Sequence, residues 1–210
     1  MSDYPSVQKN TELIIRELEN RFPALFSRCE APARPVVIAI DGRCASGKST
    51  LAAALKAALE DGACGSVDLF HMDDFYLRPE QRTAERFAES GGNVDRERFL
   101  EEVLEPLLRG EAFAYRPFDC GTMALRGPVA VPKARLAIVE GSYSCHPLLR
   151  GNYDLRVFLS VGPAEQRRRL LQRNGEERLR LFEERWIPFE ERYFADCGAA
   201  DCCELRLCGE

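Results

Sequence analysis

A short segment with glycine at both ends of its turn carries the clearest chemical signal in the sequence. Residues 42–49 read GRCASGKS and match the phosphate-loop pattern G-x-x-x-x-G-K-[ST], between an apolar segment, 36–40, and a helix-forming one. Backbone N–H groups of such a loop surround a polyphosphate at a helix N-terminus, where the partial positive charge favours anions. We expect the Lys48 ammonium to contact the β- and γ-phosphates of ATP and the Ser49 hydroxyl to bind Mg²⁺. The predicted ATP-binding set is Gly42, Arg43, Cys44, Ala45, Ser46, Gly47, Lys48, Ser49 and Thr50.

The loop alone does not say what becomes of the nucleotide, because GTPases, mechanical ATPases and kinases share it. The sequence contains no D-x-x-G and no Asn followed by Lys, so the motifs by which GTPases switch and read guanine are missing. The strand-like segment 136–140 ends in a single Glu140 instead of the Asp-Glu pair of many ATPases. These differences favour a kinase that acts on a small molecule.

Two carboxylates follow predicted strands and suit phosphoryl transfer to a hydroxyl group. Such a transfer needs a carboxylate that accepts or orients the hydroxyl proton, and acidic groups that hold Mg²⁺. Asp73 follows the segment 66–71 and Glu140 ends the segment 136–140, so both should lie at the sheet edge that carries the loop. We expect Asp73 to be the catalytic base and a metal ligand, and Glu140 to be a metal ligand. Asp74 is as readily explained as a turn residue or a helix N-cap.

An arginine-rich segment follows the strand-like segment 156–160. Most of the charges in 165–178 are typical of a solvated helix face paired with Glu. Arg169 and Arg173 are four residues apart and therefore lie on one side of a helix. We expect this pair to be catalytic, as part of a lid around 163–180 that stabilises charge on the transferring phosphoryl group.

The elements that must position these residues alternate between strand and helix. Strands are predicted at 36–40, 66–71, 136–140, 156–160 and 202–207, and helices at 48–61, 96–108, 146–150, 163–172 and 176–193. This order predicts an α/β fold with a five-stranded parallel sheet flanked by helices. Thr11 is the predicted N-cap of an additional helix whose apolar positions run to Phe26, before the helix-breaking Ala31–Pro35 segment. We expect an N-terminal helical extension over 1–35 and one kinase domain over 36–210.

Composition excludes several classes of protein. The chain has 210 residues, of which 45% are hydrophobic and 30% charged, as in an ordinary globular domain. The net charge of -5 gives no reason to expect nucleic-acid binding. No apolar run approaches the roughly 18 residues of a membrane helix, and the first ten residues lack a secretion signal, so we expect a cytoplasmic protein with no membrane partner. A homo-oligomer is compatible with the sequence.

The nine cysteines predict neither a disulfide framework nor a zinc ribbon, because their number is odd and no two have the spacing C-x-x-C. The C-terminal group Cys197, Cys202, Cys203 and Cys208 has spacings unlike those of common zinc motifs, and no His lies nearby. Free thiols are the favoured interpretation.

Several motifs in order resemble one family. In chain order, these motifs are the phosphate loop, MDDFYL at 72–77, GNVD at 92–95, FD at 118–119, VEG at 139–141 and the Arg-rich segment. With these motifs in this order, residues 36–207 resemble the uridine kinase and phosphoribulokinase group of P-loop kinases. The resemblance implies a P-loop NTPase fold of the nucleoside-kinase type. It also implies transfer of the γ-phosphate of ATP, with Mg²⁺, to a primary hydroxyl of a nucleoside or similar riboside, uridine or cytidine first.

The resemblance also implies roles for single residues. Asp73 matches the family's base near Mg²⁺, Glu140 its metal-positioning glutamate and Asp95 its ribose-hydroxyl aspartate, although Asp95 is as readily a helix N-cap. Phe118-Asp119 resembles a segment that stacks on the base, and Arg169 and Arg173 fall where the family has lid arginines. The predicted substrate-binding set is Asp73, Tyr76, Asp95, Phe118 and Met123.

Two departures from the family leave the acceptor open. Position 118 is Phe where uridine kinases have Tyr, and Met123 stands where the histidine that reads the pyrimidine is expected. Nicotinamide riboside, pantothenate or a phosphorylated sugar are alternative acceptors, and the last would call for an Arg or Lys cluster in the acceptor pocket. An alternative of another class is an ATP-binding regulatory module without a small-molecule acceptor.

Overall fold

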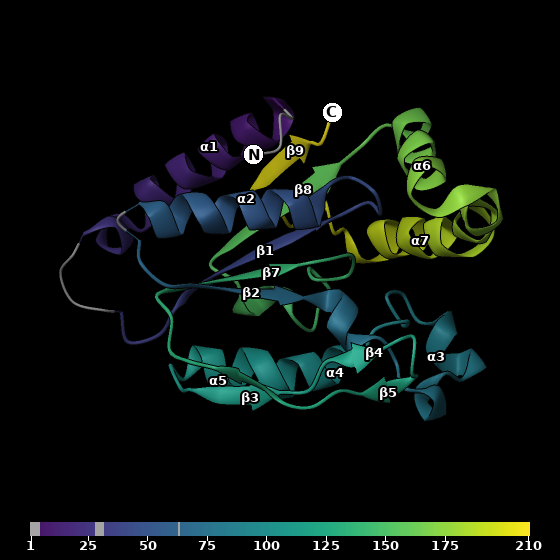
Figure 1. Cartoon of the computed structure of the whole chain (residues 1–210), viewed down its shortest axis with the longest axis horizontal. Coiled ribbons are helices and arrows are strands. Elements are labelled where there is room, and N and C mark those ends of the chain that lie inside the picture. The colour runs from purple at the N-terminus through teal and green to yellow at the C-terminus, as the bar shows by residue number, and fades with distance from the viewer. Residues whose placement is uncertain (1–4, 28–31, 63) are drawn as a thin grey trace.

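A five-stranded parallel sheet forms the centre of the computed structural model, which describes residues 5–27, 32–62 and 64–210 (Figure 1). The strand order is β2-β7-β1-β8-β9, and every ladder is parallel. The strands are β1 (Val36–Gly42), β2 (Val67–His71), β7 (Leu136–Glu140), β8 (Leu155–Ser160) and β9 (Leu205–Cys208). The predicted α/β fold is confirmed, although β9 starts three residues later than expected.

The two faces of β1 enter different parts of the hydrophobic core. Val36, Ile38 and Ile40 pack with the helices α1 (Pro5–Arg21) and α2 (Lys48–Asp61), which lie together on one side of the sheet (Figure 1). Val37 and Ala39 pack into the core on the opposite side. A central parallel strand is buried on both faces, which explains why this segment shows no polar alternation.

The N-terminal helix starts earlier than the sequence predicted. Thr11 lies inside α1 and is buried, so its assignment as the N-cap is wrong. Pro5 opens the helix instead, because proline's fixed φ and missing N–H suit the first helical turn. Asn10 Nδ2 donates to the carbonyl of Cys208 at 2.7 Å, which joins α1 to β9. Part of the predicted break at 31–35 lies outside the described residues.

The second face is covered by a continuous helical segment at the predicted position, 96–108. It consists of α4 (Arg96–Phe99), a π-helical turn (η4, Leu100–Leu104) and α5 (Glu105–Leu108). Pro106 explains the π-helical turn, because a widened turn removes the clash between the proline ring and the carbonyl one turn earlier. This side also carries the short helix α3 (Ala84–Ala88) and two small antiparallel strand pairs. In one pair, β3 (Phe113–Tyr115) lies beside β6 (Val129–Val131), and in the other, β4 (Phe118–Asp119) lies beside β5 (Ala124–Leu125).

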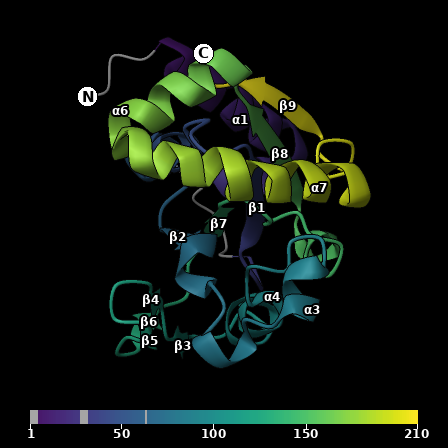
Figure 2. The same ribbon diagram turned by 90° about the vertical axis from the view of Figure 1, so that its right-hand side faces the viewer.

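Two helices stand beyond the carboxyl ends of the strands. The helices α6 (Pro163–Leu181) and α7 (Ile187–Cys197) are joined by a π-helical turn (η6, Phe182–Trp186), and Figure 2 shows α7 crossing in front of the sheet. Gly175 interrupts α6 with φ 76° and ψ 174°, where the sequence predicted the gap between two helices.

The helix predicted at 146–150 does not form. That segment makes consecutive turns, with a 3₁₀ turn at Arg150–Asn152 (η5), because the N–H groups of His146 and Leu149 bond to carbonyls three residues back. Within the described part of the chain, each helix is too short or too polar to cross a membrane.

Candidate active site

The phosphate loop connects β1 to α2 through backbone conformations that favour glycine. Gly42 and Gly47 have φ of 136° and 97°, and Ala45 has φ 59°. A Cβ on Gly42 would lie 1.9 Å from the carbonyl oxygen of Leu159, so only glycine fits there. The tight turn ends at Lys48, the first residue of α2, and the N–H groups of that helix N-terminus face the loop.

Lys48 is held inside the loop by oxygen atoms. Its Nζ donates to the carbonyls of Gly42 and Arg43 at 2.8 Å each, and to the hydroxyl of Ser142 at 3.3 Å. The Ser46 hydroxyl is buried and has no hydrogen-bond partner among the described residues. A cationic side chain, a helix N-terminus and an unpartnered buried hydroxyl together fit a polyphosphate.

The predicted metal ligands Ser49 and Glu140 are in contact. Ser49 Oγ donates to Glu140 Oε1 at 3.0 Å, and the same oxygen lies 2.5 Å from Nδ1 of His71. The hydrogen bond and the negative charge of Glu140 raise the pKa of His71. A hydroxyl and a carboxylate at the end of an anion-binding loop are hard oxygen donors, which fit Mg²⁺.

His71 is a site residue that the sequence analysis missed. It ends β2 and lies opposite Glu140 in the parallel register of β2 and β7. The signal that identified Asp73, a polar residue at the carboxyl end of a strand, applies equally to His71.

Asp73 and its neighbour Asp74 have different surroundings. Both lie in the 3₁₀ turn η2 (Met72–Phe75) that follows β2. Asp73 is exposed, and its Oδ1 accepts a hydrogen bond of 2.9 Å from the hydroxyl of Tyr76, whose pKa is raised by burial and by this carboxylate. Asp74 instead pairs with Arg126 at 3.2 Å and accepts a bond from Tyr115. Only Asp73 is available to a ligand.

Of the two predicted lid arginines, Arg169 is fastened to the loop. Its Nη1 donates to the carbonyls of Ala45 and Ser46 at 3.2 and 3.3 Å, and its Nη2 donates to that of Gly209 at 2.8 Å. Arg173, one turn further along α6, is exposed and lines the same cavity. The predicted pair therefore does share one side of α6.

Glu190 of α7 reaches the loop from the other side. Its Oε2 accepts a bond of 2.9 Å from the backbone N–H of Cys44, and its Oε1 accepts one of 2.6 Å from Ser142 Oγ. Burial and this carboxylate raise the pKa of the Cys44 thiol to about 12. The sequence offered no signal for Glu190, which lies in a charged helical segment without a local motif.

Asp41 fastens the loop from behind and was also missed. It is fully buried and accepts hydrogen bonds from the N–H groups of Gly42, Tyr143 and Cys145 and from the Tyr193 hydroxyl, at 2.6 to 3.1 Å. Burial raises the pKa of Asp41 to about 6. Because Tyr193 belongs to α7, this carboxylate ties the loop to the C-terminal helices.

The phosphate loop and several of its neighbours line one cavity of about 810 Å³. Its lining contains the loop residues 44–50, together with Asp73, Tyr76, Glu140, Arg169 and Arg173. The loop's first two residues, 42 and 43, are outside the lining. Arg82, Cys120 and the aromatic residues Phe87 and Trp186 also line it, although no motif in the sequence indicates them.

Three predicted substrate residues lie outside that lining. Asp95 is buried and acts as the N-cap of α4, accepting bonds from the Arg98 N–H and from Gln81 Nε2. Phe118 is buried, with the Arg82 guanidinium 5.6 Å above its ring. Met123 is 38% exposed in a turn with φ 55°.

The architecture is similar to that of several solved proteins described as kinases. No family model matches the sequence. A possible uridine kinase from Bacillus stearothermophilus has a similar structure, with a TM-score of 0.68, 20% identity, and coverage of 96% of this chain and 97% of that one. A candidate fructose transport system kinase from Silicibacter has a TM-score of 0.61 and 23% identity, with 95% of this chain and 98% of that one covered. D-glycerate 3-kinase from Cryptococcus neoformans has a TM-score of 0.63 and 18% identity, with 91% of this chain and 89% of that one covered. The chain therefore has the α/β fold of uridine kinase-like and related P-loop kinases.

Proposed function

We propose that the protein is a Mg²⁺- and ATP-dependent kinase that transfers the γ-phosphoryl group to a hydroxyl of a small molecule. The observation that carries the proposal is the shared cavity: the phosphate loop with Lys48 and Ser49 forms one part of its wall, and the exposed carboxylate of Asp73 forms another. A phosphate donor and an acceptor hydroxyl can therefore meet in one cavity.

The proposed roles follow from the contacts. Lys48 and the loop amides would hold the phosphates, and Ser49, Glu140 and Asp73 would hold Mg²⁺, which would supply positive charge beside them. Asp73 accepts the proton of the acceptor hydroxyl, and the Tyr76 hydroxyl orients that carboxylate. Arg169 and Arg173 stabilise charge on the transferring group from the side of α6.

For the acceptor, we propose a primary hydroxyl of a nucleoside or related riboside, with uridine or cytidine first and nicotinamide riboside and pantothenate as alternatives. The order of motifs along the chain supports this class. Phe87, Trp186 and Tyr76 give the cavity wall aromatic surface on which a flat base can stack.

A phosphorylated sugar is a second candidate that one observation favours. Arg82 lines the cavity together with Asp73 and Tyr76, and Arg185 does so from the turn η6. Guanidinium groups bind phosphate oxygens in a bidentate manner, so these two residues offer the kind of donor that an acceptor phosphate needs.

The deciding experiment measures ADP release from ATP and Mg²⁺ over a panel of uridine, cytidine, other nucleosides, nicotinamide riboside, pantothenate and ribulose phosphate. We expect turnover that depends on a riboside. Turnover with the sugar phosphate alone would support the second candidate. ATP binding without any acceptor-dependent turnover would contradict the proposal and favour a regulatory ATP-binding module.

A further inference from the structure

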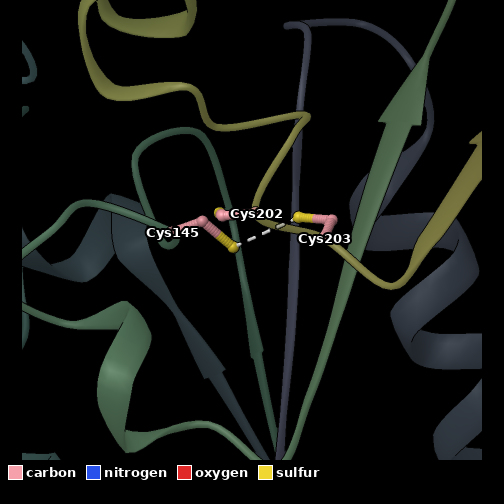
Figure 3. Close-up of side chains that lie close together, drawn as sticks. All are labelled: Cys145, Cys202 and Cys203. Atoms are coloured by element: carbon pink, nitrogen blue, oxygen red, sulfur yellow. Dashed lines mark hydrogen bonds between the residues drawn. The ribbon is translucent and has the colours of Figure 1, made fainter.

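Three cysteines that the proposed function does not use meet in the core. Cys145 lies in the loop after β7, and Cys202 and Cys203 lie between α7 and β9; their side chains converge in Figure 3. Each of the three sulfur atoms lies within 4.8 Å of the other two. Cys145 and Cys203 are buried, and Cys202 is partly exposed.

The spacing of the sulfurs suits a metal ion. The Sγ atoms of Cys145 and Cys203 are 3.7 Å apart, and both cysteines are free thiols. A disulfide would hold the sulfurs about 2.05 Å apart. A tetrahedral ion about 2.3 Å from each sulfur separates two of them by roughly 3.8 Å. The buried pair therefore already has the separation that a common metal ligand shell requires.

The surroundings also suit thiolate ligands. The Arg150 guanidinium lies beside Cys202, and its Nη1 donates to the carbonyl of Cys197 at 2.8 Å. Three thiolates and a divalent ion carry one net negative charge, and the Arg150 guanidinium lies beside them. A monovalent ion would leave one more negative charge in a buried position next to the Asp41 carboxylate, to which the Cys145 N–H donates, so the charges favour a divalent ion.

We propose that Cys145, Cys202 and Cys203 bind one thiophilic divalent cation, of which Zn²⁺ is the common example. Binding replaces the three S–H protons by three metal–sulfur bonds and releases those protons to solvent, with no change of oxidation state. Two of the protons now point to the carbonyl of Ala199, to which Cys202 and Cys203 donate at 3.2 and 3.1 Å. A water molecule would supply a fourth ligand from the partly exposed side of Cys202.

Such an ion would stabilise the structure behind the phosphate loop. The backbone N–H of Cys145 donates to Asp41 at 2.8 Å, and Asp41 in turn accepts the N–H of Gly42. The ion would also join the loop after β7 to the segment that leads into β9. These links assign the site a structural role, separate from the Mg²⁺ ligands of the proposed reaction.

The test is a titration of the reduced full-length protein with Cd²⁺ in the absence of oxygen. The ultraviolet absorbance of the sulfur-to-metal charge-transfer band measures binding. Hard oxygen ligands at Ser49 and Glu140 do not give this signal. We expect saturation at one equivalent, and displacement of Cd²⁺ by Zn²⁺ in a competition experiment. Zn²⁺ should also raise the melting temperature of the protein.

Single-residue variants identify the ligands. Cys202→Ser, at a partly exposed position, and Cys203→Ser should each raise the Kd for Cd²⁺ at least about a hundredfold. This is a larger increase than the loss of a residue that only supports a metal ligand would cause. Cys208→Ser is the matched control, because Cys208 is an exposed cysteine of the same C-terminal segment, outside the cluster. Its Kd should not change.

Three results would overturn the assignment: no charge-transfer band in the reduced protein, a band that survives the Cys202→Ser and Cys203→Ser substitutions, or a band lost equally in Cys208→Ser. Circular dichroism of each variant separates loss of binding from loss of folding.

Discussion

At the scale of single residues, neighbouring carboxylates have separate tasks because their partners differ. Asp73 is exposed to the cavity and accepts a bond from Tyr76, whereas Asp74 is engaged by Arg126 and Tyr115. Asp73→Asn removes the proposed proton acceptor, so we expect kcat to fall by about 10²–10⁴ with little change in ATP affinity. Asp74→Asn is the matched control and should retain kcat within a few-fold. Steady-state kinetics and ATP titration check both, and full turnover in Asp73→Asn would remove this residue from the base role.

The buried carboxylate of Asp41 should make the free energy of unfolding of the metal-free protein depend on pH. Its pKa is about 6 in the folded state and about 4 in an unfolded chain. The folded state therefore holds the proton more tightly, and the associated stability is present below pH 4 and is lost as the pH rises through 6. Asp41→Asn lacks this titration. We expect the free energy of unfolding of the wild type, relative to the variant, to fall by roughly 2–3 kcal/mol between pH 4 and pH 7.

Urea denaturation of the two proteins at a series of pH values, with a chelator present, measures that difference. A difference that stays constant over this range would show that the four hydrogen bonds to Asp41 outweigh its burial.

At the scale of elements, the C-terminal helices depend on one backbone conformation. Gly175 has φ 76° and ψ 174°, a region that essentially only glycine enters. A Cβ there would meet no atom within 4 Å, so the cost of a side chain is conformational alone. We expect Gly175→Ala to lower the free energy of unfolding by about 1–3 kcal/mol.

Gly151→Ala is the control for that measurement, because a Cβ on Gly151 would also meet no atom within 4 Å and its φ lies outside the left-handed region. We expect its unfolding free energy to change by less than about 0.5 kcal/mol. Equal values for both variants in urea denaturation would mean that α6 changes its path at Gly175 without strain.

At the scale of the whole molecule, the N-terminal helix is part of the main core. Ile14 and Leu18 of α1 are fully buried in the same cluster as Leu51 of α2 and Ile38 of β1. Leu18→Ala should therefore lower the free energy of unfolding by about 2–5 kcal/mol, as for a core leucine. Leu148, which is 41% exposed, is the control; Leu148→Ala should be nearly neutral. A small loss in Leu18→Ala, measured by thermal or urea unfolding, would indicate that α1 is a separable extension.

The sequence by itself determined the features that depend on neighbouring residues. The strand–loop–helix unit around Lys48, the helical segment at 96–108 and the polar ends of β2 and β7 follow from local hydrophobic period and motif spacing. The parallel sheet followed from the alternation of these elements. Local patterns also misled: the segment 146–150 has helical composition, but the N–H groups of His146 and Leu149 bond three residues back, and a single bond of the α-helical kind, from Arg150 N–H to the His146 carbonyl, does not extend into a helix.

Only the tertiary structure decided which distant side chains meet. The order β2-β7-β1-β8-β9 places Glu140 between His71 and the loop, and the path of α7 brings Glu190 to the N–H of Cys44. The same path returns Cys203 to Cys145, 58 residues earlier in the chain. Such contacts depend on strand order and helix packing, which are selected by the free energy of the whole core and leave no mark in the spacing of neighbouring residues.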